Sequence, residues 1–315
     1  MKKIIGYHGS EGANAHLACL KFCPEFEPKA YQSFEDVFAA VESGTISRGM
    51  FPLENSAAGR VTEIYNLLSK PDKFSIVKEG RLRIEHHLAS IPGSSLKDIK
   101  KVFSHYQALA QCKKELKNLK LEACEYQNTA LAAKFIAEQG DKESAALCSR
   151  MAAKVNGLEI VRENLQDDKE NATLFIVISK WKKDSKSLPD QNNSEASKYS
   201  LIKKIREIFL VKRTLDVEVE RKILTSWICQ IPNKPKALYK AIGCFANNDL
   251  NIVQFENFIK GTSSKQAYFF ITAEANPNSP STKKAIKDLK KCTIRPGTRN
   301  LGSYDADQSR SEGAK

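Results

Sequence analysis

The sequence predicts an α/β protein in which a larger N-terminal region is followed by a smaller βαββαβ domain. Over the first 180 residues, short apolar runs alternate with segments of helical apolar spacing. Residues 184–200 are polar and lack apolar periodicity, which is typical of a linker. From residue 223 onward, strand and helix patterns follow one another in the order βαββαβ. A chain of 315 residues agrees with this division, because one domain usually takes about 100–200 residues.

The chain begins with an expected buried strand at residues 3–7, and a helix carrying Leu17 and Leu20 follows it. Gly9 and Gly12 lie in the turn between them, where glycines can bring backbone N–H groups close to a ligand. A second helix is predicted by the apolar spacing from Phe34 to Val41, and Gly44 would end it.

The next stretch joins a strand to a compact set of polar side chains. Its sequence is Phe51-Pro52-Leu53-Glu54-Asn55-Ser56-Ala57-Ala58-Gly59. Pro52 is compatible with a strand edge but not with a helix interior. We expect Asn55 or Ser56 to cap a helix formed around Ile64 and Leu68, as in an ordinary N-cap turn. Such a turn would direct a carboxylate, an amide and free N–H groups to one point, which suits a small anion.

The middle of the chain continues the alternation of strands and helices. Strands are expected at residues 74–77, 82–88, 102–103 and 121–126, and a helix is expected to begin at Asn128-Thr129. Residues 144–147 and 158–161 suggest further α/β alternation. Ser104 should cap a helix that runs through Leu116 and places Gln107 and Gln111 on one face. A serine hydrolase is not indicated, because no Gly-x-Ser-x-Gly turn surrounds Ser104. Thr173 lies where a polar loop becomes a buried strand.

Composition excludes several classes of protein. The net charge of +13 comes from scattered lysines without a nucleic-acid-binding signature, so no nucleic-acid partner is expected. No apolar run approaches the roughly 18 residues that a membrane span needs, and the N-terminus lacks the apolar segment of a signal peptide. The eight cysteines contain no Cys-x-x-Cys pair, which indicates no metal site and favours a reducing cytoplasm.

Four motifs resemble those of the prephenate dehydratase family. They are Gly9-x-x-Gly12, Pro52-x-Glu54-Asn55-Ser56-x-x-Gly59, Ser104-His105-x-Gln107-Ala108-x-x-Gln111-Cys112, and Gln166-Asp167 through Asn171-x-Thr173-x-Phe175. The resemblance implies a catalytic region over residues 1–180 with two α/β lobes, similar to periplasmic binding proteins, and a cleft between them. One lobe would comprise about 1–77 with 165–180, and the other 78–164.

The resemblance also implies the reaction, in which prephenate loses CO2 and water to give phenylpyruvate during L-phenylalanine biosynthesis in the cytoplasm. This lyase chemistry needs oriented donors that hold a small dicarboxylate, and no cofactor or metal is expected. Thr173 would assist departure of the hydroxyl group through a hydrogen bond. The implied catalytic residues are Thr173, Glu54, Asn55 and Gln111, and the implied substrate-binding residues are Ser56, Ser104, Thr129 and Gly12.

The motifs depart from the family pattern at several positions. Ala13 and Ala15 stand where the family has Thr and Ser, and Leu174 stands where it has an Arg that could hold a carboxylate. Tyr106 and Asn128 replace the usual Pro and Ser. Two alternatives therefore stay open. One is arogenate dehydratase, acting on the amino analogue of prephenate, and the other is a metabolite-sensing relative without catalysis.

The C-terminal pattern at 223–304 resembles an ACT domain, which in this family binds phenylalanine and contributes to an oligomer. The matching effector positions are Ala237, Leu238, Asn251 and Glu256. Lys236 replaces a glycine, and Asn257-Phe258-Ile259 replaces Ser-Arg-Pro, so phenylalanine is expected to act weakly or not at all. A homo-oligomer, either a dimer or a tetramer, is implied. Residues 181–222 would form a linker with an amphipathic helix at 201–210, and 305–315 a disordered tail.

Overall fold

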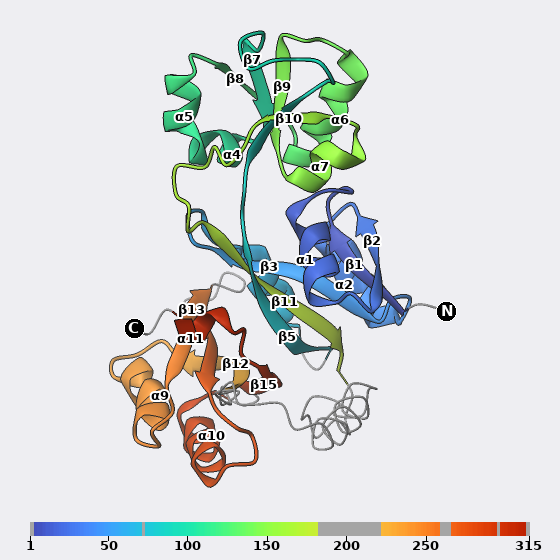
Figure 1. The fold of residues 1–315 in the computed structure, drawn as a ribbon. Helices are drawn as coiled ribbons and strands as arrows, with labels where there is room; N and C mark the ends of the chain where they lie inside the picture. Colours follow the sequence, from blue (N-terminus) through green and yellow to red (C-terminus); the bar gives the residue numbers. More distant parts are fainter. Residues whose placement is uncertain (1–2, 71–72, 182–221, 259–265, 295–296, 313–315) are drawn as a thin grey trace, which may run out of the picture. The chain divides into compact units, whose positions relative to one another are not determined.

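The computed structural model describes residues 3–70, 73–181, 222–258, 266–294 and 297–312 (Figure 1). These residues form two compact units. The first contains Met1–Phe74 and Glu79–Lys180, and the second contains Ser75–Lys78 and Trp181–Lys315. The predicted polar linker at 184–200 and the predicted helix at 201–210 lie outside the described residues. Among the helices that are described, none combines the length and apolarity required to cross a bilayer.

The first sheet of unit 1 has the strand order β2-β1-β3-β11-β5, with β4 paired to β3. Its strands are β1 (Lys3–His8), β2 (Phe26–Tyr31), β3 (Arg48–Asn55), β4 (Gly59–Arg60), β5 (Phe74–Arg83) and β11 (Ala172–Lys180). Its helices are α1 (Asn14–Phe22), α2 (Phe34–Ser43) and α3 (Thr62–Leu68). β11 runs antiparallel to β3 and aligns Thr173 with Asn55. Residues 118 positions apart in the sequence therefore meet at the end of β3.

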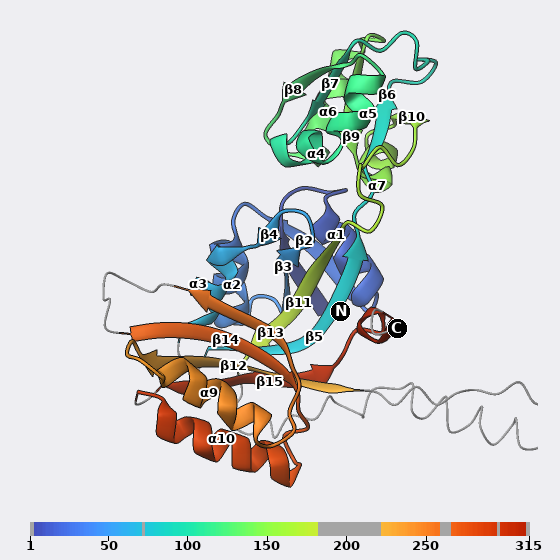
Figure 2. The same cartoon turned by 90° about the vertical axis from the view of Figure 1, so that its left-hand side faces the viewer.

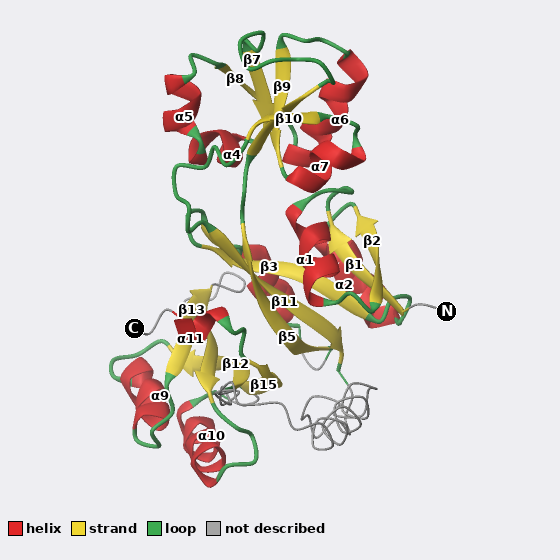
Figure 3. Cartoon of the chain, viewed as in Figure 1, coloured by secondary structure: helices red, strands yellow, loops and turns green. Residues whose placement is uncertain are grey.

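The second sheet of unit 1 has the order β10-β6-β9-β7-β8. Its elements are β6 (His87–Ser90), β7 (Lys101–Ser104), α4 (Tyr106–Gln111), α5 (Lys113–Asn118), β8 (Glu122–Glu125), α6 (Thr129–Gln139), β9 (Ser144–Cys148), α7 (Arg150–Val155) and β10 (Glu159–Arg162). Leu88 and Leu147 pack with α4 and α5, whereas the alternate residues Ala89 and Ala146 pack with α6 and α7. The sheet is thus covered on both faces (Figure 3).

Unit 2 contains a four-stranded antiparallel sheet of order β13-β14-β12-β15. Its elements are β12 (Ile223–Pro232), α9 (Ala237–Ala246), β13 (Ile252–Phe258), β14 (Gln266–Glu274), α10 (Pro280–Cys292), β15 (Thr298–Asp305) and α11 (Ser309–Glu312). Both α9 and α10 lie on one face of this sheet (Figure 2). Trp227, Phe245 and Leu289 belong to the core between these layers.

The predicted fold class is confirmed, because an α/β region with two sheets precedes a βαββαβ domain. Three local predictions were wrong. β2 was missed, the expected strand at 82–88 is divided between β5 and β6, and the expected disordered tail at 305–315 begins with the end of β15 and includes α11. The chain changes sheets between Arg83 and His87, so one apolar alternation there belongs to two strands.

Neither expected cap forms in unit 1. No side chain caps α3, which begins seven residues after Asn55, because the segment after β3 turns back into β4 instead of entering a helix. The cap of α4 is His105, whose Nδ1 accepts from the Gln107 N–H at 3.3 Å. Cys112 then separates α4 from α5, so the single helix expected to run through Leu116 is two short helices.

Candidate active site

A cluster of side-chain amides lies where β3 and β11 meet. The Asn55 Nδ2 group donates to Asn171 Oδ1 at 2.8 Å and to Thr173 Oγ1 at 2.9 Å. Thr173 therefore accepts a hydrogen bond from Asn55 and keeps its own O–H available. Within the described part of the chain, no residue accepts a hydrogen bond from that O–H, and the Thr173 side chain is only 7% exposed. The arrangement presents one buried, oriented hydroxyl donor.

The turn that follows β3 is held by the same asparagine. Asn55 Oδ1 accepts from the backbone N–H groups of Ala57 at 3.0 Å and Ala58 at 2.8 Å. Ser56 extends the contact with β11, since its N–H donates to the Ala172 carbonyl and its Oγ accepts from the Ala172 N–H at 3.0 Å. Both the Nδ2 donor and the Oδ1 acceptor of Asn55 are thus engaged in hydrogen bonds, which fixes the orientation of the amide beside Thr173.

Gln111 brings the other half of unit 1 into the cluster. Its Oε1 accepts from Asn171 Nδ2 at 3.0 Å and lies 2.9 Å from His86 Nε2. Since an amide oxygen can only accept, His86 carries its proton on Nε2. Gln166 supports His86 by accepting its backbone N–H at 3.0 Å. The end of α4 is thereby tied to β11 through side chains.

His86 was missed by the sequence analysis, although two adjacent histidines, His86 and His87, were a visible signal. The His86 side chain is buried, and burial lowers its pKa despite the opposing hydrogen bond to Gln111. His87 is buried as well, and burial followed by the nearby Arg150 lowers its pKa. Both imidazoles are therefore neutral in the folded protein at neutral pH.

We expect stability to fall as pH decreases below about 6.5, the usual histidine pKa in an unfolded chain. Below that pH the histidines of the unfolded chain bind protons, whereas the buried His86 and His87 of the folded chain stay neutral because their pKa is lowered. The unfolded state is therefore favoured increasingly as pH falls, and the free energy of unfolding decreases. Each histidine can contribute a slope of at most about 1.4 kcal/mol per pH unit. Unfolding free energies measured from pH 8 to pH 5 should decline less steeply in His86→Gln. Equal slopes in the two proteins would contradict this assignment.

A cavity of about 290 Å³ adjoins the amide cluster. Its lining consists of Ala57, Ala110, Gln111, Gln166, Asp167, Asp168 and Asn171. Three amides thus face the cavity together with two carboxyl-bearing residues, and no lysine or arginine lines it among the described residues. Asp167 Oδ2 accepts from the Lys114 N–H at 3.2 Å, and Asp168 Oδ1 accepts from the Glu170 N–H at 2.8 Å. The cavity combines neutral donors with a local negative charge.

Glu54 and Leu174 lie on the other side of the strand pair. Leu174 of β11 is paired with Glu54 of β3, and the next pair along the strands is Thr173 with Asn55. Because neighbouring residues of a strand point to opposite faces of the sheet, Glu54 and Leu174 lie on the face opposite to Asn55 and Thr173. Leu174 is buried in the core at 5% exposure. The leucine therefore replaces a family arginine on the Glu54 face, not on the face of the Thr173 hydroxyl. Arg60 lies opposite Glu54 in the β3–β4 pair, so a guanidinium-bearing residue still neighbours this carboxylate.

Three residues implied by the resemblance lie outside this cluster. Ser104 is fully buried and its hydroxyl donates to the Leu147 carbonyl at 2.6 Å. Thr129 is the first residue of α6 and does not line the cavity. Gly12 has φ +85, and a Cβ there would lie 2.5 Å from the Ala152 backbone, so its role in the structure is close packing. The structure brings together Asn55, Ser56, Gln111 and Thr173 from the predicted set.

Comparison with known proteins identifies the N-terminal region. Residues 5–183 match the family described as prephenate dehydratase. A protein of Komagataeibacter europaeus described as a bifunctional N-acyl-homoserine lactone acylase/prephenate dehydratase is 32% identical over 91% of this chain and 91% of its own length. Arogenate dehydratase/prephenate dehydratase 1 of Arabidopsis thaliana is 31% identical over 81% of this chain, which spans 57% of that relative.

Two solved structures share the fold of this chain over almost its full length. A structure described as GqqA, a novel type of quorum quenching acylase, has a TM-score of 0.79 at 31% identity and covers 98% of this chain and 100% of its own. Prephenate dehydratase from Arthrobacter aurescens in complex with L-Phe has a TM-score of 0.78 at 23% identity, covering 96% and 90% of the two chains, which supports the shared fold. Since the family match spans more than half of the 315 residues, this chain belongs to the prephenate dehydratase family.

Proposed function

We propose that this chain converts prephenate to phenylpyruvate with release of CO2 and water. The observation that carries the proposal is the Thr173 hydroxyl, which accepts from Asn55 and keeps its proton for a further acceptor. The leaving hydroxyl of the substrate is such an acceptor. In the reaction, the bond to the ring carboxylate breaks, its electron pair enters the ring, and the C–O bond breaks as the ring becomes aromatic. The departing hydroxide takes a proton from solvent and is released as water.

The residues of the cluster contribute donors and position. A hydrogen bond from Thr173 would stabilise the negative charge that develops on the departing oxygen, without full transfer of the threonine proton. Gln111 and Asn171 line the cavity, and amide N–H groups there can hold substrate oxygens. His86 is buried at 3% exposure and its ring reaches the cluster through Gln111, so we assign it a positioning role.

The direct test is incubation of the purified chain with prephenate and, in parallel, with arogenate. We expect phenylpyruvate from prephenate in amounts that increase with enzyme and time. Absence of product from both substrates, with a folded protein that still binds prephenate, would favour the metabolite-sensing alternative.

Arogenate is a second candidate substrate because carboxylates line the cavity. Asp167 and Asp168 border it, and no described lysine or arginine does. Prephenate carries two carboxylates and a keto group, whereas arogenate carries an ammonium group in place of the keto group. The negative charge of Asp167 and Asp168 attracts the ammonium group of arogenate. It repels prephenate more strongly, because prephenate has a net charge of −2 and arogenate a net charge of −1. The electrostatics of the cavity therefore favour the amino substrate.

Asp168→Asn tests the electrostatic effect. We expect the ratio of kcat/KM for arogenate to kcat/KM for prephenate to fall by about three- to tenfold, because one carboxylate near a partly exposed cavity contributes about 1 kcal/mol. Glu170→Gln is the matched control, since Glu170 lies in the same loop but does not line the cavity. An unchanged ratio in Asp168→Asn would remove this residue from substrate choice.

We propose that unit 2 is an ACT domain that contributes to a cytoplasmic homo-oligomer. Leu238 is 38% exposed and Tyr239 is 79% exposed at the start of α9, and a partner subunit would cover both side chains. Of the implied effector positions, Ala237 is buried in the first turn of α9, Asn251 directly precedes β13, and Glu256 lies within β13.

Lys236 makes weak regulation by phenylalanine testable. It precedes α9 with φ 66, the left-handed conformation that favours glycine. We expect Lys236→Gly to stabilise the fold by up to about 1 kcal/mol and to strengthen phenylalanine binding, because it relieves backbone strain and clears the approach to the helix N-terminus. Calorimetric titration of both proteins measures the binding. Micromolar binding and strong inhibition in the unsubstituted chain would contradict the prediction.

A further inference from the structure

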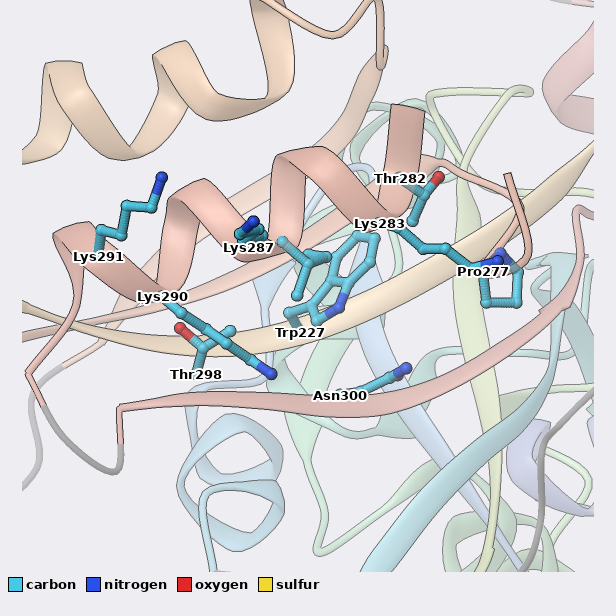
Figure 4. A pocket seen from close by; sticks show the side chains of 10 residues that line it. Trp227, Pro277, Thr282, Lys283, Lys287, Lys290, Lys291, Thr298 and Asn300 are labelled. Atoms are coloured by element: carbon cyan, nitrogen blue, oxygen red, sulfur yellow. The ribbon is translucent and has the colours of Figure 1, made fainter. Parts of the chain in front are cut away.

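A second cavity, of about 640 Å³, lies within unit 2 and has no role in the proposed reaction. It runs between α10 and the neighbouring strands β12 and β15, with the partly buried Ile286 and, at 2% exposure, Trp227 as its apolar lining (Figure 4). Thr298 and Asn300 on β15 border it on the other side. The volume falls within the range of about 300–1,000 Å³ that is usual for sites of small ligands.

Positive charge is concentrated on the helix that borders this groove. Lys283, Lys287 and Lys290 repeat at intervals of four and three residues, which places them on one face of α10. In Figure 4, Lys290 extends from α10 towards Thr298 and Asn300, and Lys283 extends towards Pro277. The ends of both lysines therefore lie near the border of the groove.

These three ammonium groups make no ion pair with a described residue. Lys291 also lines the groove, but its ammonium group pairs with Asp288 at 2.7 Å. No aspartate or glutamate belongs to the described lining. Like charges at these spacings repel one another, so an anion bound between them would relieve the repulsion.

We propose that this groove binds a small hydrophobic carboxylate that carries no amino group. The apolar surface around Trp227 would receive the hydrophobic body, and Lys283 and Lys290 would hold the carboxylate at the border. An amino acid would bring an ammonium group among three unpaired lysines without any acid in the lining to receive it. The groove thus discriminates against phenylalanine and is distinct from the implied effector positions on α9 and β13.

Two sources share this ligand chemistry. One is an aromatic keto acid such as phenylpyruvate, whose choice as a probe rests on the proposed function. The other is an acid with a short acyl chain, for which octanoate is the probe. The two probes differ in shape but share one carboxylate and an apolar body.

The chain contains two tryptophans, Trp181 and Trp227, and this provides a local reporter. The full chain labelled with 15N-tryptophan gives two indole N–H signals, and Trp181→Phe identifies the signal of Trp227. We expect phenylpyruvate or octanoate to shift the Trp227 signal in a saturable manner at or below about millimolar concentration. Inorganic phosphate should bind at least about tenfold more weakly because it has no apolar body, and L-phenylalanine because its ammonium group would lie among the unpaired lysines.

A double substitution, Lys283→Gln with Lys290→Gln, should weaken the binding of the carboxylate by at least about tenfold. Lys284→Gln is the matched control, because Lys284 lies on the same helix but does not line the groove, and it should leave binding unchanged. The proposal is overturned if neither carboxylate shifts the signal at about 10 mM, if phosphate or phenylalanine binds equally well, or if the double variant binds as tightly as the control. Since the signal requires no turnover, absence of dehydratase activity would not alter any of these outcomes.

Discussion

Replacing Thr173 with valine is expected to lower kcat for phenylpyruvate formation by about 10²–10³-fold, which is the usual cost of losing one oriented donor in an active site. Valine preserves the branched shape of threonine but has no hydroxyl to meet the leaving group. The change in KM should be small, because the lost hydrogen bond strengthens only as the C–O bond breaks. Steady-state kinetics with prephenate measure both constants.

Thr173→Ser is the control for this prediction. Serine retains a hydroxyl whose oxygen can accept from Asn55 Nδ2, as threonine Oγ1 does at 2.9 Å, and whose O–H can donate to substrate. It should keep kcat within about tenfold of the unsubstituted enzyme. Thermal unfolding of both variants separates catalysis from folding, since Thr173 is almost fully buried. A folded valine variant with near-normal kcat would show that another group assists departure of the hydroxyl.

The sequence predicted the elements whose apolar spacing is strong. The helix at 34–41 appears as α2, and the βαββαβ pattern expected from residue 223 onward appears as β12, α9, β13, β14, α10 and β15. In both cases one face of each element is buried against a neighbour, so the pattern of the sequence and the packing carry the same information. The residue types of the amide cluster were also visible, because Asn55, Gln111 and Thr173 each belong to a motif.

The sequence did not reveal how distant segments use the same polar groups. β2 is an edge strand that contains Pro28 and has no fully buried side chain, so it lacks the apolar alternation that marks a strand. Asn55 was expected to cap a helix because an asparagine before an apolar periodic segment is the usual signal. Its actual partners include Asn171 and Thr173, more than 100 residues away, and local spacing contains no information about them.

The same limit applies to His86 and Leu174. His86 enters the cluster only because Gln111 reaches it from α4. The absence of arginine at position 174 suggested a missing group in the site, but the side of the sheet on which that group would lie depends on the register of β11 against β3. A one-residue change in register would exchange Thr173 and Leu174 between the two faces.

Asn55→Asp is expected to lower kcat/KM by about 10³-fold, because it changes both the donor beside Thr173 and the charge near the cavity. The carboxylate has nearly the size of the amide, but it cannot donate to Asn171 Oδ1 or Thr173 Oγ1, which now receive hydrogen bonds at 2.8 Å and 2.9 Å. Thr173 would then turn its own O–H towards the new carboxylate and lose it as a donor to substrate. The added negative charge would also oppose binding of a dicarboxylate.

A pH profile gives this substitution a distinctive result. Below the pKa of the new carboxyl group, its protonated form can donate one hydrogen bond, so kcat/KM of Asn55→Asp should recover in part as pH falls, within the range where the protein stays folded. Asn66→Asp is the matched control, because it makes the same change at an exposed position of α3 outside the amide cluster, and it should retain kcat/KM within about twofold. If the Asn55→Asp variant is folded and keeps normal kcat/KM at neutral pH, Asn171 has reoriented to replace the lost donors and Asn55 does not orient the Thr173 hydroxyl.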